Sequence, residues 1–225
     1  MPRTKLFSGP GDKRITRALC IVAHPDDIEF YCAGSVAQMT ERGVAVDFVV
    51  ATSGDKGTRD ERQTRAQLAA TREREQKAAA KILGALNVTF LGLPDAELEE
   101  NLGLRQVFVR EIRRSRPDVV LTFDPTPGYR QHPDHRVVGR VTLDAAWPSA
   151  RDLLTFPKAG TPHNTAEAWC FAGPNPNLEV DVSAQLEIKI RARLAHASQT
   201  PSPAGLRARW RHIAKVERFH QVDLR

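Results

Sequence analysis

The sequence HPDD at residues 24–27 places an imidazole and two carboxylates within four positions. It follows a short apolar run, residues 19–23, which is typical of a buried strand bounded by turn residues. His24 and Asp27 lie three positions apart across a turn that enters a helix, so their side chains can converge on one ion. Asp26 lies between them and need not point the same way.

A second group of this kind, HPDH at residues 132–135, follows the apolar run 118–122. Ligand sites in open α/β sheets lie at the carboxyl ends of strands, so both groups should open onto the same edge. A catalytic zinc takes three protein ligands and keeps one position for water. His24, Asp27 and either His132 or His135 satisfy that count, which leaves Asp26 and the other histidine as acid–base candidates. Each motif alone could be a turn or a helix N-cap, but two of them on one sheet favour function.

The patterns that flank these motifs alternate between strand and helix. We expect strands at residues 19–23, 44–51, 87–91 and 118–122, and helices at residues 29–42, 63–83, 102–114 and 135–146. Alternation at this spacing predicts parallel βαβ units with right-handed crossovers. The predicted fold class is therefore α/β: a Rossmann-like, open, mostly parallel sheet flanked by helices in three layers.

Residues 147–176 interrupt this alternation, because they are rich in Pro, Gly, Thr and Asn and only 168–172 resemble a strand. We interpret them as an irregular insertion in a single domain of residues 1–225. Long loops of this kind are often binding loops or lids. A surface excursion or an oligomer contact is an equally good interpretation, so a homo-oligomer is one expectation. Residues 180–197 then predict a strand end and a helix.

The composition of the 225 residues is that of an ordinary globular protein, with 41% hydrophobic and 27% charged residues. The net charge is +6, and 25 of the 33 basic residues are arginine, which suits acidic substrates or nucleic acid. Only 6% of residues are aromatic and no nucleic-acid-binding motif is present, so nucleic acid is disfavoured. Residues 189–225 carry nine basic and two acidic residues. We expect that segment to be a solvated or oligomer-facing surface first, and an anion-attracting rim second.

Targeting and redox signals point to the cytoplasm. The three cysteines are dispersed and form no C-x-x-C pair, which favours reduced thiols. The polar first 17 residues contain no apolar signal core, and no stretch is long enough for a membrane span. No G-x-G-x-x-G sequence follows a strand, so a dinucleotide cofactor is not expected.

Several blocks of the chain resemble the zinc-dependent N-acetylglucosaminyl deacetylases of the PIG-L/LmbE family. AHPDDIE at residues 23–29 and HPDHR at residues 132–136 carry the resemblance. Supporting blocks are TSGDKG at residues 52–57, RERE at 72–75, FLGLPD at 90–95 and AHASQ at 195–199. The resemblance extends from about residue 19 to residue 199.

The resemblance implies an LmbE-like fold and one zinc ion (Zn²⁺) per chain, held by His24, Asp27 and His135. It implies that Asp26 is the general base and that His132 acts as an acid or as a stabiliser of the oxyanion.

The resemblance also implies, less specifically, that Asp55, Arg72 and Asp95 lie near the sugar. One departure from the family pattern concerns the residue just before HPDH, where some relatives have a tyrosine. Here Tyr129 comes three positions before the motif, and Arg130 could face an acidic substrate instead.

The expected reaction is hydrolysis of an N-acyl group, above all N-acetyl, from an amino sugar or its conjugate, with release of acetate and a free amine. Zinc suits this chemistry because it lowers the pKa of bound water to about 7 and polarises a carbonyl. An amidase of a thiol conjugate is the first alternative. A phosphoesterase is less favoured because it usually needs more carboxylates for a second metal, and a nucleic-acid-binding protein is the remaining alternative.

Overall fold

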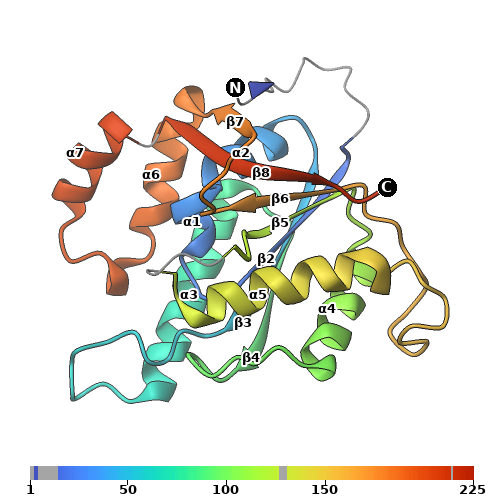
Figure 1. The fold of residues 1–225 in the computed structure, drawn as a ribbon. Helices are drawn as coiled ribbons and strands as arrows, with labels where there is room; N and C mark the ends of the chain where they lie inside the picture. Colours follow the sequence, from blue (N-terminus) through green and yellow to red (C-terminus); the bar gives the residue numbers. More distant parts are fainter. Residues whose placement is uncertain (1–2, 5–14, 127–130, 214) are drawn as a thin grey trace.

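The computed structural model describes residues 3–4, 15–126, 131–213 and 215–225, and its strands form one sheet. The strands are β1 (Arg3–Thr4), β2 (Arg17–Val22), β3 (Ala45–Thr52), β4 (Asn87–Leu93), β5 (Val119–Phe123), β6 (Glu167–Phe171), β7 (Leu178–Asp181) and β8 (Val216–Asp223). Their order is β1-β7-β8-β6-β5-β2-β3-β4 (Figure 1). β8 runs antiparallel to both neighbours, and the other pairs are parallel. The predicted mostly parallel α/β sheet is confirmed.

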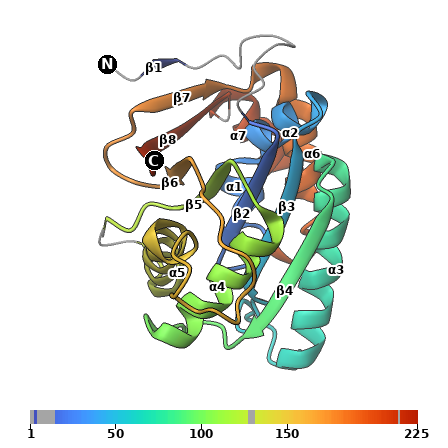
Figure 2. The same cartoon turned by 90° about the vertical axis from the view of Figure 1, so that its right-hand side faces the viewer.

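Helices cover both faces of this sheet. They are α1 (Asp27–Tyr31), α2 (Ala33–Glu41), α3 (Arg65–Leu83), α4 (Leu102–Ser115), α5 (Pro133–Asp144), α6 (Leu186–Leu194) and α7 (Pro203–Ile213). Figure 2 shows α4 and α5 on one side and α2, α3 and α6 on the other, which confirms the three layers. Among the described residues, no helix is both long and apolar enough to cross a membrane.

The helix α3 ends at Leu83, where its sequence predicts, and begins at Arg65, two residues after the predicted start. Thr64 and Gln67 form a reciprocal capping box at its start. Gly84 ends it in the left-handed conformation, with φ 77°, which favours glycine. The central strands β2 and β5 are almost completely buried, so the core lies on both faces of the middle of the sheet.

The predicted single helix over residues 29–42 is wrong in one respect, because it divides into α1 and α2 at Cys32. Glu217 of β8 explains the division. Its carboxylate accepts hydrogen bonds from the backbone N–H groups of Gly34 (2.8 Å) and Ser35 (2.7 Å). A buried carboxylate at a helix N-terminus satisfies free donors and complements the helix dipole. This contact joins residues more than 180 positions apart, so no local pattern indicates it.

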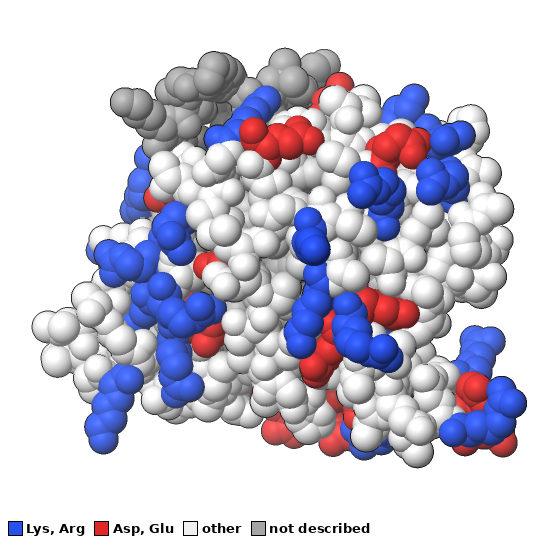
Figure 3. All heavy atoms as spheres, turned by 180° about the vertical axis from the view of Figure 1, so that it is seen from behind, with Lys and Arg blue, Asp and Glu red and all other residues white. Residues whose placement is uncertain are grey.

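The basic C-terminal segment is not the uniformly solvated surface that its charge predicts. It contains a strand, β8, and two of its basic residues are buried: Lys189 and Arg193, each 3% exposed. Arg207 and Arg211 do lie on the surface, where both bind Glu187. On the face shown in Figure 3, basic side chains lie in several separate groups, many of them beside acidic ones.

The insertion packs at the amino ends of the strands, whereas the two histidine motifs lie at their carboxyl ends. Arg113 of α4 donates hydrogen bonds to six of its carbonyl groups. The ring Nε2 of His163 lies 2.8 Å from the carbonyl oxygen of Pro117, which precedes β5. Residues 149–163 therefore lie near the amino end of β5 and are not placed as a lid over the motifs.

Candidate metal centre

The first motif forms a tight turn after β2. The backbone N–H of His24 donates to Oδ2 of Asp27 at 2.7 Å. Asp26 has φ 95°, a left-handed conformation that is uncommon for residues other than glycine. This turn lets α1 begin at Asp27, directly beside the histidine. Strained backbone of this kind is concentrated at functional sites.

The second motif forms the start of α5, at the carboxyl end of β5. His132 is the N-cap, and its Nδ1 accepts a hydrogen bond from the backbone N–H of Asp134 at 3.2 Å. Pro133 occupies the first helical position, which suits its fixed φ. The ring of His135 stacks on Phe123, the last residue of β5, with centroids 3.8 Å apart.

Three donor atoms from the two motifs converge. Nδ1 of His24 lies 3.2 Å from Nε2 of His135 and 3.7 Å from Oδ2 of Asp27. Nε2 of His135 lies 3.2 Å from Oδ1 of Asp27. Zinc–ligand distances of about 2.0–2.2 Å in a tetrahedral site place donors roughly 3.3 Å apart, so this group is of the right size for a metal ion.

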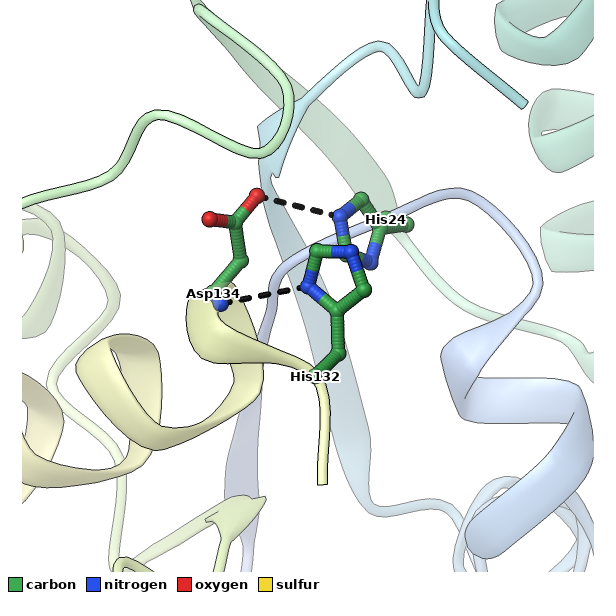
Figure 4. A group of neighbouring side chains, drawn as sticks. All are labelled: His24, His132 and Asp134. Atoms are coloured by element: carbon green, nitrogen blue, oxygen red, sulfur yellow. Dashed lines mark hydrogen bonds and ion pairs between the residues drawn. The ribbon is translucent and has the colours of Figure 1, made fainter. Parts of the chain in front are cut away.

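A second group, His24, His132 and Asp134, shares His24 with the first (Figure 4). Oδ2 of Asp134 lies 3.2 Å from Nε2 of His24. Both carboxylate oxygens of Asp134 already accept backbone hydrogen bonds, from Ala96 (2.7 Å) and Leu98 (3.3 Å). A carboxylate held in this way orients the imidazole, as is usual for metal-binding histidines.

Asp95, expected near the sugar, contacts the same histidine. Its Oδ1 lies 3.0 Å from Nε2 of His24, and its Oδ2 accepts from the backbone N–H of Lys56 at 2.9 Å. Burial alone would raise the pKa of Asp95, but the hydrogen bond and charge of His24, the backbone N–H of Lys56 and the charge of Arg72 together outweigh burial and lower the pKa to about 2. A contact between Asp95 and substrate stays a prediction.

The electrostatics of this group favour a cation. Burial lowers the pKa of His24, but the hydrogen bonds with Asp134 and Asp95 and the charge of Asp27 outweigh burial and raise it to about 10. For Asp27, burial is likewise outweighed by His135 and His24, which lower its pKa. The carboxylates that favour a cation at His24 provide the negative charge, and the imidazoles provide the nitrogen ligands, that a divalent ion requires.

Asp26 lies beside this group and has contacts of its own. Its Oδ1 lies 3.4 Å from Nη2 of Arg72, and its Oδ2 lies 3.7 Å from Nη2 of Arg193. Its backbone N–H donates to Oε1 of Gln76 at 2.9 Å. Burial and the charge of Asp27 raise the pKa of Asp26 to about 6, against the two arginines, which lower it.

Behind Asp26 lies a completely buried group from α1, α3 and the turn that follows α6. Nε2 of Gln76 donates to Oε1 of Glu29 at 3.1 Å, and Nε2 of His196 lies 3.1 Å from Oε2 of Glu29. All three side chains are buried. The AHASQ block thus supplies a histidine that supports the turn at Asp26 through Glu29 and Gln76.

Two other residues expected near the sugar line the adjoining loops. Asp55 pairs with Arg65 at 2.6 Å and stays partly exposed. Arg72 is buried, and it donates to the carbonyl oxygens of Pro25 (2.6 Å) and Gly54 (2.9 Å). It therefore joins the turn of the first motif to the loop after β3.

Two of the residues that the sequence points to, Tyr129 and Arg130, lie outside the described residues. Conversely, the sequence interpretation missed Gln76, Arg193 and the orienting role of Asp134. Gln76 follows the RERE block directly, and Arg193 precedes AHASQ by two residues, so the family blocks are close to both. Their roles depend on contacts between helices that spacing does not reveal.

Comparisons with known proteins agree with this site. A family model described as GlcNAc-PI de-N-acetylase (PIG-L) matches residues 19–146. Diacetylchitobiose deacetylase of Thermococcus kodakarensis is 36% identical over 131 residues, 58% of this chain and 49% of that protein. A probable N-acetyl-α-D-glucosaminyl L-malate deacetylase of Bacillus anthracis is 34% identical over 155 residues. The match covers 67% of this chain and 65% of that protein. The matched part thus spans about half to two thirds of these relatives.

Among solved structures, N,N'-diacetylchitobiose deacetylase of Pyrococcus horikoshii superposes with a TM-score of 0.88 at 26% identity. The superposition covers 96% of this chain and 86% of that one. Because the family model matches more than half of the chain and contains both histidine motifs, the chain belongs to the PIG-L family of GlcNAc-PI de-N-acetylases.

Proposed function

We propose that the protein is a zinc-dependent deacetylase that hydrolyses the N-acetyl group of an amino sugar or its glycoside, releasing acetate and a free amine. The observation that carries the proposal is the three-donor group of His24, Asp27 and His135 with the carboxylate of Asp26 beside it. The named activities of the relatives, which act on N-acetylglucosamine compounds, support the same reaction.

The donor set of the proposed ligands, His24, Asp27 and His135, suits zinc, with two imidazoles and one carboxylate for one ion per chain. When bound, zinc would supply Lewis-acid polarisation of the acyl carbonyl and a lowered pKa for water. Asp134 and Asp95 hold His24 in the orientation that this assignment requires.

Asp26 is the proposed general base. It lies outside the three-donor group, and its contacts with Arg72 and Arg193, at 3.4 and 3.7 Å, leave its oxygens able to accept a further proton. It would take the proton of the attacking water and return it to the departing amine. General acid–base catalysis of this kind contributes roughly 10²–10⁴-fold in rate.

His132 is the proposed donor to the oxyanion. Because its Nδ1 accepts the backbone N–H of Asp134, the ring proton of neutral His132 resides on Nε2. That N–H is available to the charge that develops on the acyl oxygen. The loop residues Asp55, Arg72 and Asp95 are the proposed neighbours of the sugar, and Arg130 is a proposed contact of an acidic substituent.

Two further properties are proposed from the burial of the cysteines and the exposure of the insertion. The three cysteines are free and buried, which supports a reduced, cytoplasmic protein. Trp147, Leu153 and Leu154 of the insertion are exposed, which supports contact with another copy of the chain.

A phosphoesterase is disfavoured by the donor groups. The two groups found among the described residues share His24, so they provide for one ion and not for the metal pair of many phosphoesterases. An amidase of a thiol conjugate would use the same amide chemistry, so only its substrate distinguishes it from the proposed deacetylase.

The test is an amine-release assay on the purified protein, with metal content measured on the same sample. The substrates tested are N-acetylglucosamine, diacetylchitobiose, the N-acetylglucosaminides of malate and of inositol, and a thiol conjugate. We expect about one zinc per chain and release from at least one N-acetyl sugar. Release from the thiol conjugate alone, or phosphatase activity without amine release, would overturn the proposal.

A further inference from the structure

A cavity of about 400 Å³ lies beside the metal centre, on the flank formed by β6 and β8. Four aromatic side chains line it, together with charged ones: Phe30 and Tyr31 of α1, Phe171 at the end of β6, and Trp210 of α7. The first motif precedes α1, so two of the walls follow the metal centre directly in the chain. Figure 1 shows α1, α6 and α7 beside the ends of β6 and β8. The volume is within the range of small-molecule sites, about 300–1,000 Å³.

Side chains that line the cavity contact the candidate centre or a residue beside it. The ring of Tyr31 stacks on Phe171 at 5.1 Å between centroids and lies 6.4 Å from the ring of His135. On the other wall, the guanidinium of Arg193 lies 4.3 Å from the ring centroid of Phe30 and 3.7 Å from Asp26. The cavity therefore adjoins the metal centre on the side of Tyr31 and Arg193.

The charges of the cavity leave one cation unpaired. Lys189 binds Glu217 at 2.6 Å, and Arg218 binds Glu179 at 2.8 Å. Arg209 also lines the cavity and is exposed, and among the described residues it forms no ion pair. An exposed arginine above aromatic walls is suited to a carboxylate carried on a carbon skeleton.

On the opposite flank of the centre, the corresponding charges are already paired. In the loops after β3 and β4, Asp55 pairs with Arg65 and Asp95 with His24, so neither leaves a free charge for an aglycone. An unbranched acyl chain would in turn favour a cavity without the charged side chains found here. The occupant that fits is an anionic group on the amine side of the substrate.

We propose that this cavity binds an anionic aglycone of the amino sugar, with Arg209 as the residue that recognises its carboxylate. The inference rests on the proposed function and specifies its substrate class. It predicts that an N-acetylglucosaminide with a negatively charged aglycone is a better substrate than an uncharged counterpart of the same size.

The experiment compares N-acetylglucosaminyl malate with its uncharged diamide. The variants are Arg209→Gln and, as a matched control on the same helix, Arg207→Gln, whose arginine binds Glu187 on the surface. For the unaltered protein we expect a kcat/KM ratio of malate to diamide above about ten, since one charge-assisted pair is worth a factor of this order. Arg209→Gln should reduce this ratio about tenfold, chiefly through KM, and Arg207→Gln should leave it unchanged.

Equal kcat/KM values for the two substrates, or an equal loss of the ratio in both variants, would overturn the inference. Binding of the deacetylated product, glucosaminyl malate, measured by calorimetry, separates this outcome from failure of the proposed function. If no N-acetyl sugar is hydrolysed, the deacetylase proposal fails. Weaker binding of this product by Arg209→Gln alone then still supports the anion site, and equal binding by all three proteins refutes it.

Discussion

The two histidine motifs share the letters HPD, yet the structure gives their aspartates opposite environments. Asp26 of the first motif lies in a left-handed turn, and its side chain contacts two arginines at 3.4 and 3.7 Å. Asp134 of the second motif lies in the first turn of α5, and its oxygens bind two backbone N–H groups and His24. Burial and the charge of Asp27 raise the pKa of Asp26. For Asp134, burial would also raise the pKa, but the hydrogen bond and charge of His24 and the two backbone N–H groups together outweigh burial and lower it.

This difference teaches that partners, and not the triplet, decide what each aspartate does. A carboxylate with both oxygens occupied by backbone N–H hydrogen bonds is stabilised in its charged form and orients a neighbour. A carboxylate with longer contacts keeps the capacity to accept a proton. The environment of Asp134 suits support of the metal site, and the environment of Asp26 suits catalysis.

The largest effect should come from the fourth residue of either motif. Asp27→Ala and His135→Ala each remove one donor of the three-atom group, so zinc content should fall from about one per chain to near zero, and activity with it. The melting temperature should fall too, because a bound ion stabilises the folded state. Metal analysis and thermal unfolding check this, and a full metal complement in either variant would refute the ligand assignment.

The next effect compares the two aspartates directly, beginning with Asp26→Asn. This change keeps the shape of the side chain but removes the proton acceptor, so kcat should fall about 10²–10⁴-fold while zinc remains bound. Steady-state kinetics with metal analysis on the same sample checks it. Unchanged kcat would show that another group is the base.

Asp134→Asn should produce the opposite result. An amide can replace only part of what the carboxylate accepts, so His24 loses its orientation and zinc affinity should fall about 10–100-fold. Competition with a chelator measures this affinity, and restoration of most activity by excess zinc is expected. A loss of kcat at saturating zinc as large as that of Asp26→Asn would refute the assignment of different roles to the two aspartates.

The smallest effect should come from the support behind Asp26. Gln76→Ala leaves the backbone N–H of Asp26 and one oxygen of Glu29 without their partner, which costs about 1–3 kcal/mol of stability. We expect kcat to fall severalfold with zinc retained. Lys81→Ala, at an exposed position of the same helix, is the control for denaturant unfolding and kinetics. Equal behaviour of the two variants would remove Gln76 from the site.

Much of the fold could be predicted because its signals are local. The apolar runs that became β2 and β5, and the capping residues of α3 with Gly84 at its end, act within a few positions of where they stand. The division of α1 from α2 and the strand β8 were not predicted. Both depend on contacts between distant segments, such as the carboxylate of Glu217 at the start of α2.

The sequence by itself determined the chemistry that this protein has available: which imidazoles and carboxylates exist, and that both motifs follow strands that end at one edge. Periodicity and turn residues suffice for that, because they report local conformation and burial. Only the tertiary structure decided that His24 faces His135 with one nitrogen and Asp134 with the other. It also placed Arg193 next to Asp26 and Arg209 over an aromatic cavity. Such pairings form between segments more than 100 residues apart, where packing of the helices on the sheet sets the distance and local sequence carries no signal of it.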